Sequence, residues 1–334
     1  MFIVDSIPVI DEPDKSEGTL QNEDIDHVTV ITNPDSIKMR GYSNLDKLIF
    51  VITKEYAKRP VDIRRIPSTK IMEQKKGVWY LKGANTPYTG RFIDYFYNGK
   101  KEGDGTFNEG VVDGVRTTYY LNGNKSFFRN YVNGIADGYS EEYFINGAIK
   151  QKGTFKKGLD DGLWQDFYST GEIKRQINFV NLKAVVSKEE EKFYSLQDKS
   201  IELLKNEDYK GAIKKLNDAI LLNSKYADTY FYRGTAKLND LDFDNAIADF
   251  DKAIQLEPLY MEALANRAFS RIRKYEFKDG RTLSKTSQVT IVAAKDKVEI
   301  PLEDKSKICA DLAKSVELGD TVDMIFDAIE RYCK

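Results

Sequence analysis

The residues of this chain that could carry out chemistry are few and do not form a catalytic set. Carboxylate pairs such as Asp160 and Asp161 fall in predicted turns, where aspartate accepts hydrogen bonds from the local backbone. The one histidine, His27, has no histidine or cysteine near it in sequence, so we interpret it as a surface or structural residue. The sequence lacks a phosphate-binding glycine loop, a metal-ligand spacing and a nucleophile elbow. We therefore predict no catalytic residues, no cofactor and no metal ion.

The two cysteines, Cys309 and Cys333, lie near the end of the sequence. Two cysteines make neither a disulfide framework nor a metal site, and reduced thiols in a core are the favoured interpretation. The two side chains could approach each other if a final helix folds back, and the sequence leaves this pairing open.

Glycines at a fixed spacing indicate the elements that organise the middle of the chain. Three series recur at every 24th position: Gly90, Gly114, Gly138 and Gly162; Gly99, Gly123, Gly147 and Gly171; and Gly110, Gly134 and Gly158. An aromatic pair precedes each glycine of the second series: Tyr95 and Phe96, Tyr119 and Tyr120, Tyr143 and Phe144, and Phe167 and Tyr168. Such a period predicts repeated units that each pack on their neighbours.

Each repeated unit is expected to contain two short strands and two turns. The Asn98-Gly99, Asn122-Gly123 and Asn146-Gly147 pairs predict two-residue type I′ turns, because both residues of such a turn need positive φ. The third glycine series, as in Asn133-Gly134 and Lys157-Gly158, marks the opposite turn. Consecutive units would form an antiparallel β-meander, whose aromatic pairs either form a stabilising ladder or present a surface to a partner.

These units resemble MORN-type repeats in a variant form that is common in bacteria. That form has a glycine, four residues, two aromatics, one residue and Asn-Gly, followed by a strand that ends in Asp-Gly. Asp113-Gly114, Asp137-Gly138 and Asp161-Gly162 match this ending. The resemblance covers roughly residues 77–180, and we assign a MORN-like domain to 77–182. Relatives include structural, membrane-associated and antitoxin-like proteins.

Residues 1–54 predict a small α/β module ahead of the repeats. Strands are expected at Phe2–Val9, Val28–Thr32 and Leu48–Thr53, with a short helix that begins at Asn33-Pro34-Asp35 and ends at Gly41. Residues 55–76 carry basic pairs without a sustained apolar period and predict a connector, after which Val78–Leu81 would begin the meander.

The order of these elements resembles the plug domain of TonB-dependent outer-membrane receptors of the kind found in Bacteroidetes. The matching residues are Val4-Asp5-Ser6-Ile7-Pro8, Asn22 with Asp24-Ile25, Gly41-Tyr42 in swapped order, and Ile49 to Lys54. The resemblance implies a plug-like module used for docking and does not imply a transport pore.

After Val180 the glycine series stop, and similar residues recur at every 34th position instead. Ser187 and Glu190 form a capping-box signature before a long helix. The positions in phase are Tyr209, Phe243 and Phe277; Leu196, Tyr230 and Leu264; Ser200, Gly234 and Ala268; Ala212 and Ala246; Leu216 and Phe250; and Ala219 and Ala253, with Pro258 closing the second copy. This second period resembles the tetratricopeptide repeat (TPR), which implies stacked helix pairs over residues 187–334.

The third copy contains an insertion at about 278–305. Gly280 stands where its second helix should begin, and the helical phase resumes at Ile308, so that Leu312 and Ser315 take the positions of Phe250 and Ala253. Alternating residues around Lys295-Asp296-Lys297 predict a β-hairpin within the insertion; they are Val289, Ile291, Val298, Ile300 and Leu302. A final amphipathic helix in 321–334 would cover the open end of the stack with Val322, Ile325, Phe326 and Ile329.

The resemblance to the tetratricopeptide repeat implies a concave face that is lined by the first helix of each pair and that usually binds peptides. On this chain the face would present Gln197, Ile201, Phe231, Tyr232, Asn266, Phe269 and Arg273. Relatives that bind a C-terminal carboxylate place Lys, Asn and Arg at set positions, which here hold Gln197, Ile201, Tyr232, Glu262 and Asn266, so that carboxylate clamp is largely absent. The face instead suits an extended or helical segment with apolar anchors, unless Phe231 and Tyr232 merely pack between helices.

Composition restricts the class of partner. The 334 residues are 41% hydrophobic, as in a soluble multidomain protein, and the net charge of −2 argues against a nucleic-acid partner. Charge balance within the repeats gives no support to contact with an anionic membrane surface, although such contact stays possible.

Apolar runs such as Leu48 to Ile52 are far shorter than the ~20 residues of a membrane span. No signal peptide is visible, which favours the cytoplasm, or the periplasm and envelope if the true start lies upstream of Met1.

Together these patterns predict a multidomain α+β protein with a plug-like α/β module, an antiparallel β-meander and an all-α solenoid that carries a β-hairpin insertion. The function that fits best is a non-enzymatic scaffold or adaptor that binds a protein or peptide, in a bacterial envelope or secretion-related complex. Two alternatives stay open: an antitoxin or immunity-type protein that acts through the β-repeats, and a membrane-surface tether.

Overall fold

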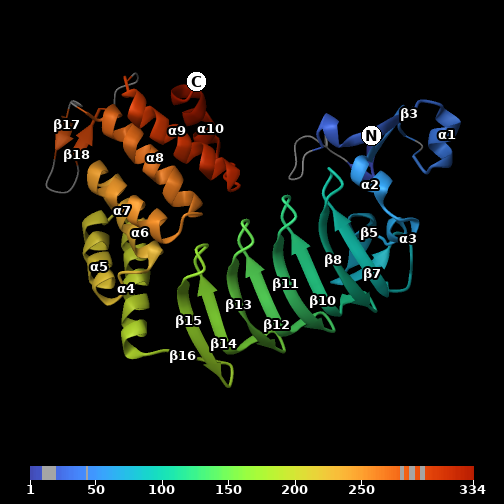
Figure 1. Cartoon of the computed structure of the whole chain (residues 1–334), viewed down its shortest axis with the longest axis horizontal. Coiled ribbons are helices and arrows are strands. Elements are labelled where there is room, and N and C mark those ends of the chain that lie inside the picture. Colours follow the sequence, from blue (N-terminus) through green and yellow to red (C-terminus); the bar gives the residue numbers. More distant parts are fainter. Residues whose placement is uncertain (10–19, 43, 279–281, 286–289, 294–297) are drawn as a thin grey trace. The chain divides into compact units, whose positions relative to one another are not determined.

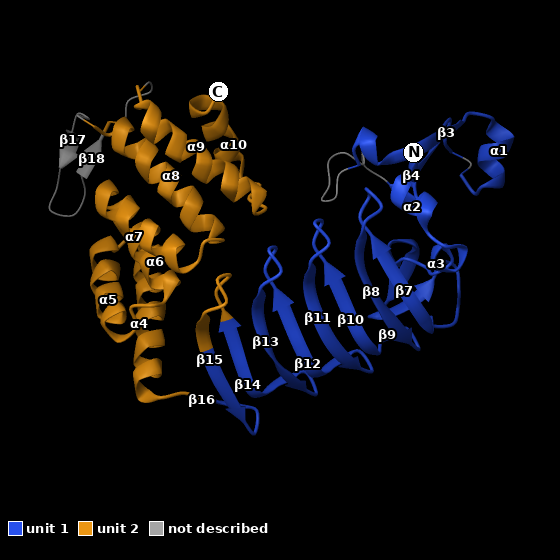
Figure 2. Cartoon of the chain, in the orientation of Figure 1, with its two compact units in different colours: residues 1–166, 176–184 blue, residues 167–175, 185–334 orange. Residues whose placement is uncertain are grey.

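The computed structural model describes residues 1–9, 20–42, 44–278, 282–285, 290–293 and 298–334. Figure 2 colours its two compact units, of which one comprises Met1–Asp166 with Gln176–Ala184 and the other Phe167–Arg175 with Val185–Lys334. Strands dominate the first unit and helices the second (Figure 1). Within the described residues, no helix has the length and apolar character needed to cross a bilayer.

The first part of the chain contains β1 (Phe2–Val4), β2 (Ile7–Val9), β3 (Ile25–Ile31), α1 (Pro34–Met39), β4 (Leu48–Thr53), α2 (Lys54–Lys58), α3 (Val61–Arg64), β5 (Met72–Lys75) and β6 (Val78–Leu81). The meander contains β7 (Gly90–Tyr95), β8 (Lys101–Asn108), β9 (Val111–Val112), β10 (Gly114–Tyr119), β11 (Lys125–Val132), β12 (Ile135–Tyr143), β13 (Ile149–Lys156), β14 (Leu159–Phe167), β15 (Ile173–Val180) and β16 (Lys183–Val185).

The N-terminal sheet has the strand order β2-β1-β4-β3, with β1 parallel to β4. The prediction of one strand over Phe2–Val9 is wrong, because Asp5 and Ser6 both adopt positive φ, 49° and 75°, and reverse the chain between β1 and β2. The predicted strand β4 and the helix α1 are confirmed, and Asn33 caps α1 by accepting a hydrogen bond from the Ser36 N–H.

The segment 55–76, for which the sequence predicts a connector, forms α2, α3 and β5. The Ile93 N–H donates to the Pro67 carbonyl, and Asp94 accepts hydrogen bonds from Ser68 and Thr69, so this segment covers the outer edge of β7. Covering an edge strand prevents its pairing with another chain. β6 pairs with β5 in a separate two-stranded sheet, so the prediction that it begins the meander is wrong.

The large sheet runs in the order β16-β15-β14-β13-β12-β11-β10-β8-β7 (Figure 1), and the short β9 pairs with β8 off this path. The predicted position of the type I′ turns is wrong. At the Asn-Gly ends only the glycine has positive φ, as at Gly123 with 89°, while both Asn133 and Gly134 have positive φ at the opposite end. The reason lies in the Asn122 side chain, which accepts from the Asn124 N–H and donates to the Ile145 carbonyl of the next unit.

The first Asp-Gly pair of the repeats, Asp113-Gly114, falls at the break between β9 and β10, whereas the next two pairs lie within strands and are not strand ends. β12 and β14 continue through Asp137-Gly138 and Asp161-Gly162. The register between β11 and β12 shifts here, because Arg129 pairs with Ser140 whereas Tyr131 pairs with Ala136. Asp160 and Asp161 therefore lie in a strand, which corrects their predicted place in a turn.

Aromatic side chains hold the single-layer sheet together. Trp164 lies over Gly153, where an added Cβ would come within 2.2 Å of the indole. The Arg129 guanidinium lies 4.6 and 4.5 Å from the ring centres of Phe127 and Phe155. The Tyr120 hydroxyl donates to the Tyr143 carbonyl of the next unit, which supports the ladder interpretation for that aromatic pair.

The helical part contains α4 (Lys188–Lys205), α5 (Tyr209–Leu222), α6 (Ala227–Asn239), α7 (Phe243–Leu256), α8 (Met261–Glu276), β17 (Thr282–Lys285), β18 (Thr290–Val292), α9 (Leu302–Glu317) and α10 (Asp323–Tyr332). The Ser187 capping box begins α4 as predicted. The small residues of the helical period are buried. The Phe250 ring of α7 occupies the space that a Cβ at Gly234 of α6 would need, so the glycine allows α6 and α7 to approach closely.

The predicted resumption of the helical phase after the insertion is confirmed, since Ile308, Leu312 and Ser315 of α9 are fully buried. The helix begins earlier than expected, at Leu302. The predicted hairpin has different strands: β17 pairs with β18, whereas Val298 and Ile300 lie outside any strand. The turn expected at Lys295-Asp296-Lys297 falls outside the described residues.

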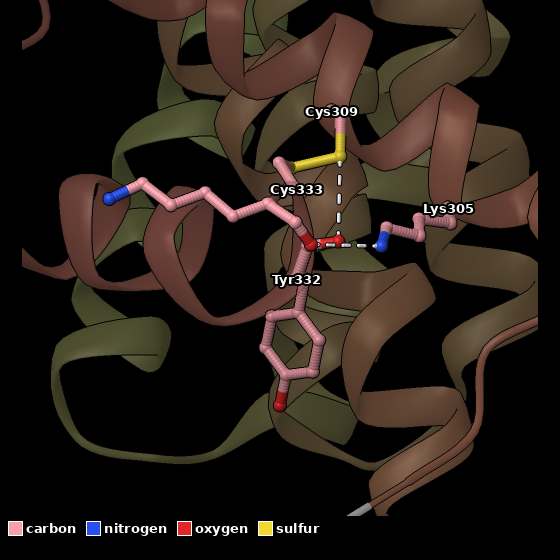
Figure 3. The surroundings of a disulfide bond; sticks show 5 residues. Lys305, Cys309, Tyr332 and Cys333 are labelled. Atoms are coloured by element: carbon pink, nitrogen blue, oxygen red, sulfur yellow. Dashed lines mark hydrogen bonds between the residues drawn. A yellow bond between two sulfur atoms is a disulfide. The ribbon is translucent and has the colours of Figure 1, made fainter.

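The final helix α10 packs by Ile325, Ala328 and Ile329, while Val322 and Phe326 stay about half exposed, at 53% and 45%. The expectation of reduced thiols is wrong. Figure 3 shows the disulfide between Cys309 of α9 and Cys333, whose Cα atoms lie 5.6 Å apart. Packing of α10 against α9 brings the two residues together, although 24 positions separate them.

Candidate functional site

The predicted groove residues come from α4, α6 and α8, the first helices of successive pairs. α6 contacts both α4 and α8, and each of the three packs against its own second helix, α5, α7 or α9. One continuous face is therefore built from the three first helices.

Two repeated ion clusters fix the helix pairs. Arg233 donates two hydrogen bonds to the buried Asp249 carboxylate, at 2.9 and 2.6 Å, and Lys237 lies 2.7 Å from it. Arg267 and Arg271 hold the buried Asp311 in the same way in the next pair.

Sequence reasoning missed these two clusters. The available signal was that Arg233 and Arg267 occupy the same phase of the helical period, as do Lys237 and Arg271. Asp249 and Asp311 are separated by more than one 34-residue period, because the insertion lies between them in the sequence. The clusters hold α6 to α7 and α8 to α9.

Gln197 and Asn266 lie between neighbouring helices of the predicted groove. The Gln197 amide is buried and donates to the Thr229 hydroxyl at 2.6 Å, while Asn266 donates to the Thr235 hydroxyl at 3.4 Å. Both amides therefore connect first helices across the stack. The Gln197 carbonyl oxygen is buried without a hydrogen-bond partner among the described residues.

Phe231 and Tyr232 differ in their surroundings. The Phe231 ring lies 4.9 Å from that of Tyr260 and 6.1 Å from that of Phe250, so it packs between helices as the structural interpretation expects. Tyr232 is half-buried against the cluster that includes Leu216, and burial raises the pKa of its phenol. Ile201 is also only partly buried.

Two of the predicted residues, Phe269 and Arg273, border a pocket. It lies between α8 and α10 and has a volume of about 210 Å³. Of the predicted groove residues Gln197 is buried, and the other six are partly exposed. Phe231 and Asn266 among these six also contact a neighbouring helix.

The hairpin tip Phe167–Arg175 belongs to the helical unit, which sequence reasoning did not foresee. The Tyr168 hydroxyl donates to the Lys225 carbonyl at 2.8 Å and accepts from the Ala227 N–H at 2.9 Å. Ser169 donates to the Glu257 carboxylate through its backbone N–H and its hydroxyl. The only available signal was that Tyr168 ends the series of aromatic pairs.

Lys174 of the same tip forms an ion pair with Asp228, at 2.7 Å. Burial raises the pKa of Tyr260, and the neighbouring Asp228 carboxylate raises it further. The tip thus neutralises a carboxylate at the start of α6, beside the first turn of the candidate groove.

Ionisable groups elsewhere also have structural partners. Burial raises the pKa of Asp5, opposed by hydrogen bonds from Thr53 and by the charge of Arg59. His27 is exposed and lies 2.7 Å from the Asp26 carboxylate, as expected of a surface residue. Among the described residues, no group of three or more His, Cys, Asp or Glu side chains could hold a metal ion.

No family model matches the chain. A stretch of 75 residues, 22% of the chain, is 33% identical to Sperm-associated antigen 1 of Rattus norvegicus and spans 8% of that protein's length. Solved structures with similarity include the OM64 TPR domain of Arabidopsis, with 19% identity, coverage of 43% of this chain and 96% of that one, and a TM-score of 0.33. The second TPR domain of human RPAP3 in complex with an HSP70 peptide has 17% identity, coverage of 44% and 98%, and a TM-score of 0.33.

Proposed function

We propose that this protein is a non-catalytic adaptor whose helical unit binds a segment of another protein along the face of α4, α6 and α8. The observation that carries the proposal is that buried contacts fix the three helices while the face keeps partly exposed side chains. Asp249 of α7 and Asp311 of α9 are buried where these second helices contact α6 and α8, and Gln197 is buried where α4 contacts α6. Tyr232 and Arg273 of the face itself stay partly exposed. A rigid face with exposed aromatic and charged side chains is typical of surfaces that recognise peptides. The resemblance of the helical period to the tetratricopeptide repeat supports the same function.

Site-specific photocrosslinking tests this proposal. Benzoylphenylalanine would replace Ile201, Tyr232 or Arg273 singly, and the controls would carry it at the exposed Lys214 of α5 and Gln255 of α7. We expect the groove positions to crosslink one common protein in an extract of the source cells. Equal capture at the control positions, or none at the groove positions, would contradict the proposal.

The disulfide bears on the cellular compartment. Because disulfides persist in oxidising compartments, the Cys309–Cys333 bond favours an envelope location over the bacterial cytoplasm. The resemblance of residues 1–54 to a plug domain points in the same direction. An adaptor of an envelope or secretion-related complex is therefore the version of the function that we favour.

The β-meander offers a second candidate function. Val115, Tyr139 and Leu163 occupy the same phase of successive units on one face of the sheet, and their exposed fractions are 43%, 42% and 52%. These exposed apolar side chains alternate with polar cross-strand neighbours, Asn130 and Thr154, and such a mixed surface suits a protein partner, as an antitoxin or immunity-type protein would need. Changing Tyr139 and Leu163 to Arg would abolish partner recovery in this case, and recovery that persists would favour the helical groove.

A further inference from the structure

We propose that the pocket between α8 and α10 binds one large apolar side chain of a partner segment, with an acidic residue beside it that pairs with Arg273. This inference rests on the proposed adaptor function and names the chemistry of the segment that the adaptor would recognise.

The size of the pocket restricts what can enter. A volume of about 210 Å³ is below the roughly 300–1,000 Å³ of pockets that hold cofactors and drug-sized ligands. A cavity of about 150 Å³ can hold a benzene molecule, so this pocket has room for one leucine, methionine or phenylalanine side chain. Its apolar walls are Phe269 and Ile272 of α8 with Met324 and Ala328 of α10.

Some polar side chains around the pocket, such as those of Tyr332 and Arg331, already have partners within the protein. The Tyr332 hydroxyl donates to the Glu276 carboxylate at 2.7 Å, and the Arg331 guanidinium lies 5.2 Å from the centre of the Tyr332 ring. Asp327 is exposed to water. The partly buried Arg273 guanidinium has no hydrogen-bond or ion-pair partner within the described part of the chain. A carboxylate on an incoming segment would supply a charge-assisted bond there.

The pocket is held in shape before any partner arrives. Ile325 and Ala328 anchor α10 in the core with Ile308 and Leu312 of α9, and the disulfide joins the end of α10 to the same helix. A preformed pocket avoids the entropic cost of ordering its walls during binding.

Fluorescence anisotropy with the full oxidised chain tests the proposal. The probes would be labelled peptides of about ten residues with a central Leu, Phe or Ala, flanked by Glu, Gln or Lys. We expect saturable binding of the Leu or Phe peptides with Glu flanks. Binding should weaken at least about tenfold, equivalent to about 1.4 kcal/mol, with Ala at the centre or Lys in the flanks.

Matched variants locate the binding. Arg273→Glu and Met324→Glu should each weaken binding about tenfold or more. Lys274→Glu on α8 and Phe326→Glu on α10 change exposed neighbours that do not border the pocket, and they should leave the affinity within about twofold. Thermal unfolding of each variant would verify that it is folded.

Two results would overturn the proposal. One is that no Leu or Phe peptide binds at concentrations up to about 1 mM. The other is that binding survives Arg273→Glu and Met324→Glu in folded protein. Crosslinking at Ile201 and Tyr232 reports separately on the adaptor function, so a failure of the pocket alone would leave groove crosslinks intact.

Discussion

Arg267 donates two hydrogen bonds to Asp311, at 2.9 and 2.6 Å, although 44 positions and the insertion lie between them in the sequence. Arg233 and Asp249 have the same relationship one repeat earlier without an insertion. The insertion therefore leaves the packing of the third helix pair unchanged, because α9 presents its carboxylate where α7 presents Asp249.

Replacing Asp311 by Asn should lower the free energy of unfolding by about 3 kcal/mol, because it removes the buried carboxylate that pairs with two partly buried arginines, Arg267 and Arg271. The control is Asp251→Asn, which also removes a partner of Arg267, at 2.7 Å, but from a side chain that is 52% exposed. That variant should cost less than about 1 kcal/mol. Urea unfolding measures both, and equal losses would contradict the assigned importance of Asp311.

The sequence predicted the periods of the fold but not the contacts between periodic units. Leu312 and Ser315 were placed correctly because burial repeats with the helical phase. The turn at Asn122 was misassigned, because its side chain bonds to the Ile145 carbonyl of the next unit, which no local pattern reveals. In the groove, Gln197 donates a hydrogen bond to Thr229 and Asn266 donates one to Thr235. These bonds depend on how neighbouring helices pack, which the sequence pattern does not show.

Gly153→Ala should destabilise the sheet by about 1–3 kcal/mol, because the new methyl group would overlap the Trp164 indole. The control is Thr154→Ala at the neighbouring exposed position, for which we expect a change of about 0.5 kcal/mol or less. In a double-mutant cycle measured by thermal unfolding, Trp164→Leu should reduce the cost of Gly153→Ala. Additive losses would show that the two side chains do not interact.

Reduction of the Cys309–Cys333 disulfide should lower the free energy of unfolding by about 3 kcal/mol, since the bond closes a loop with a sequence separation of 24. Thermal unfolding with and without dithiothreitol measures the effect. A variant with both cysteines changed to Ser should melt at the same temperature in either condition. Titration of free thiols in the unreduced, denatured protein should find none, and two thiols would contradict the disulfide.

The phenol of Tyr332 should ionise late. Burial and the hydrogen bond to Glu276 raise the pKa of Tyr332 to about 12, from an ordinary value of 10.0. Because the folded state holds this proton more tightly, the stability that Tyr332 contributes is complete below about pH 10 and is lost as the pH rises towards 12. In a pH titration followed by phenolate absorbance, the Tyr332→Phe variant should have one fewer tyrosine with a raised pKa. The Glu276→Gln variant should lower the pKa of Tyr332.

Tyr168→Phe should loosen the hairpin tip from the helical unit. The Tyr168 hydroxyl accepts a hydrogen bond from the N–H of Ala227. Ala227 has no exposed surface, and Tyr168 is only 2% exposed. Removing the hydroxyl leaves that buried N–H unsatisfied, at a cost of about 1–3 kcal/mol.

The control is Tyr120→Phe, at the same phase of an earlier unit, where the hydroxyl only donates to the Tyr143 carbonyl from a partly buried position. It should cost about 0.5–1.5 kcal/mol. Hydrogen exchange distinguishes the two variants: the Ala227 amide should exchange faster in Tyr168→Phe and at the wild-type rate in Tyr120→Phe. Unchanged protection of Ala227 in Tyr168→Phe would show that Tyr168 does not hold the start of α6.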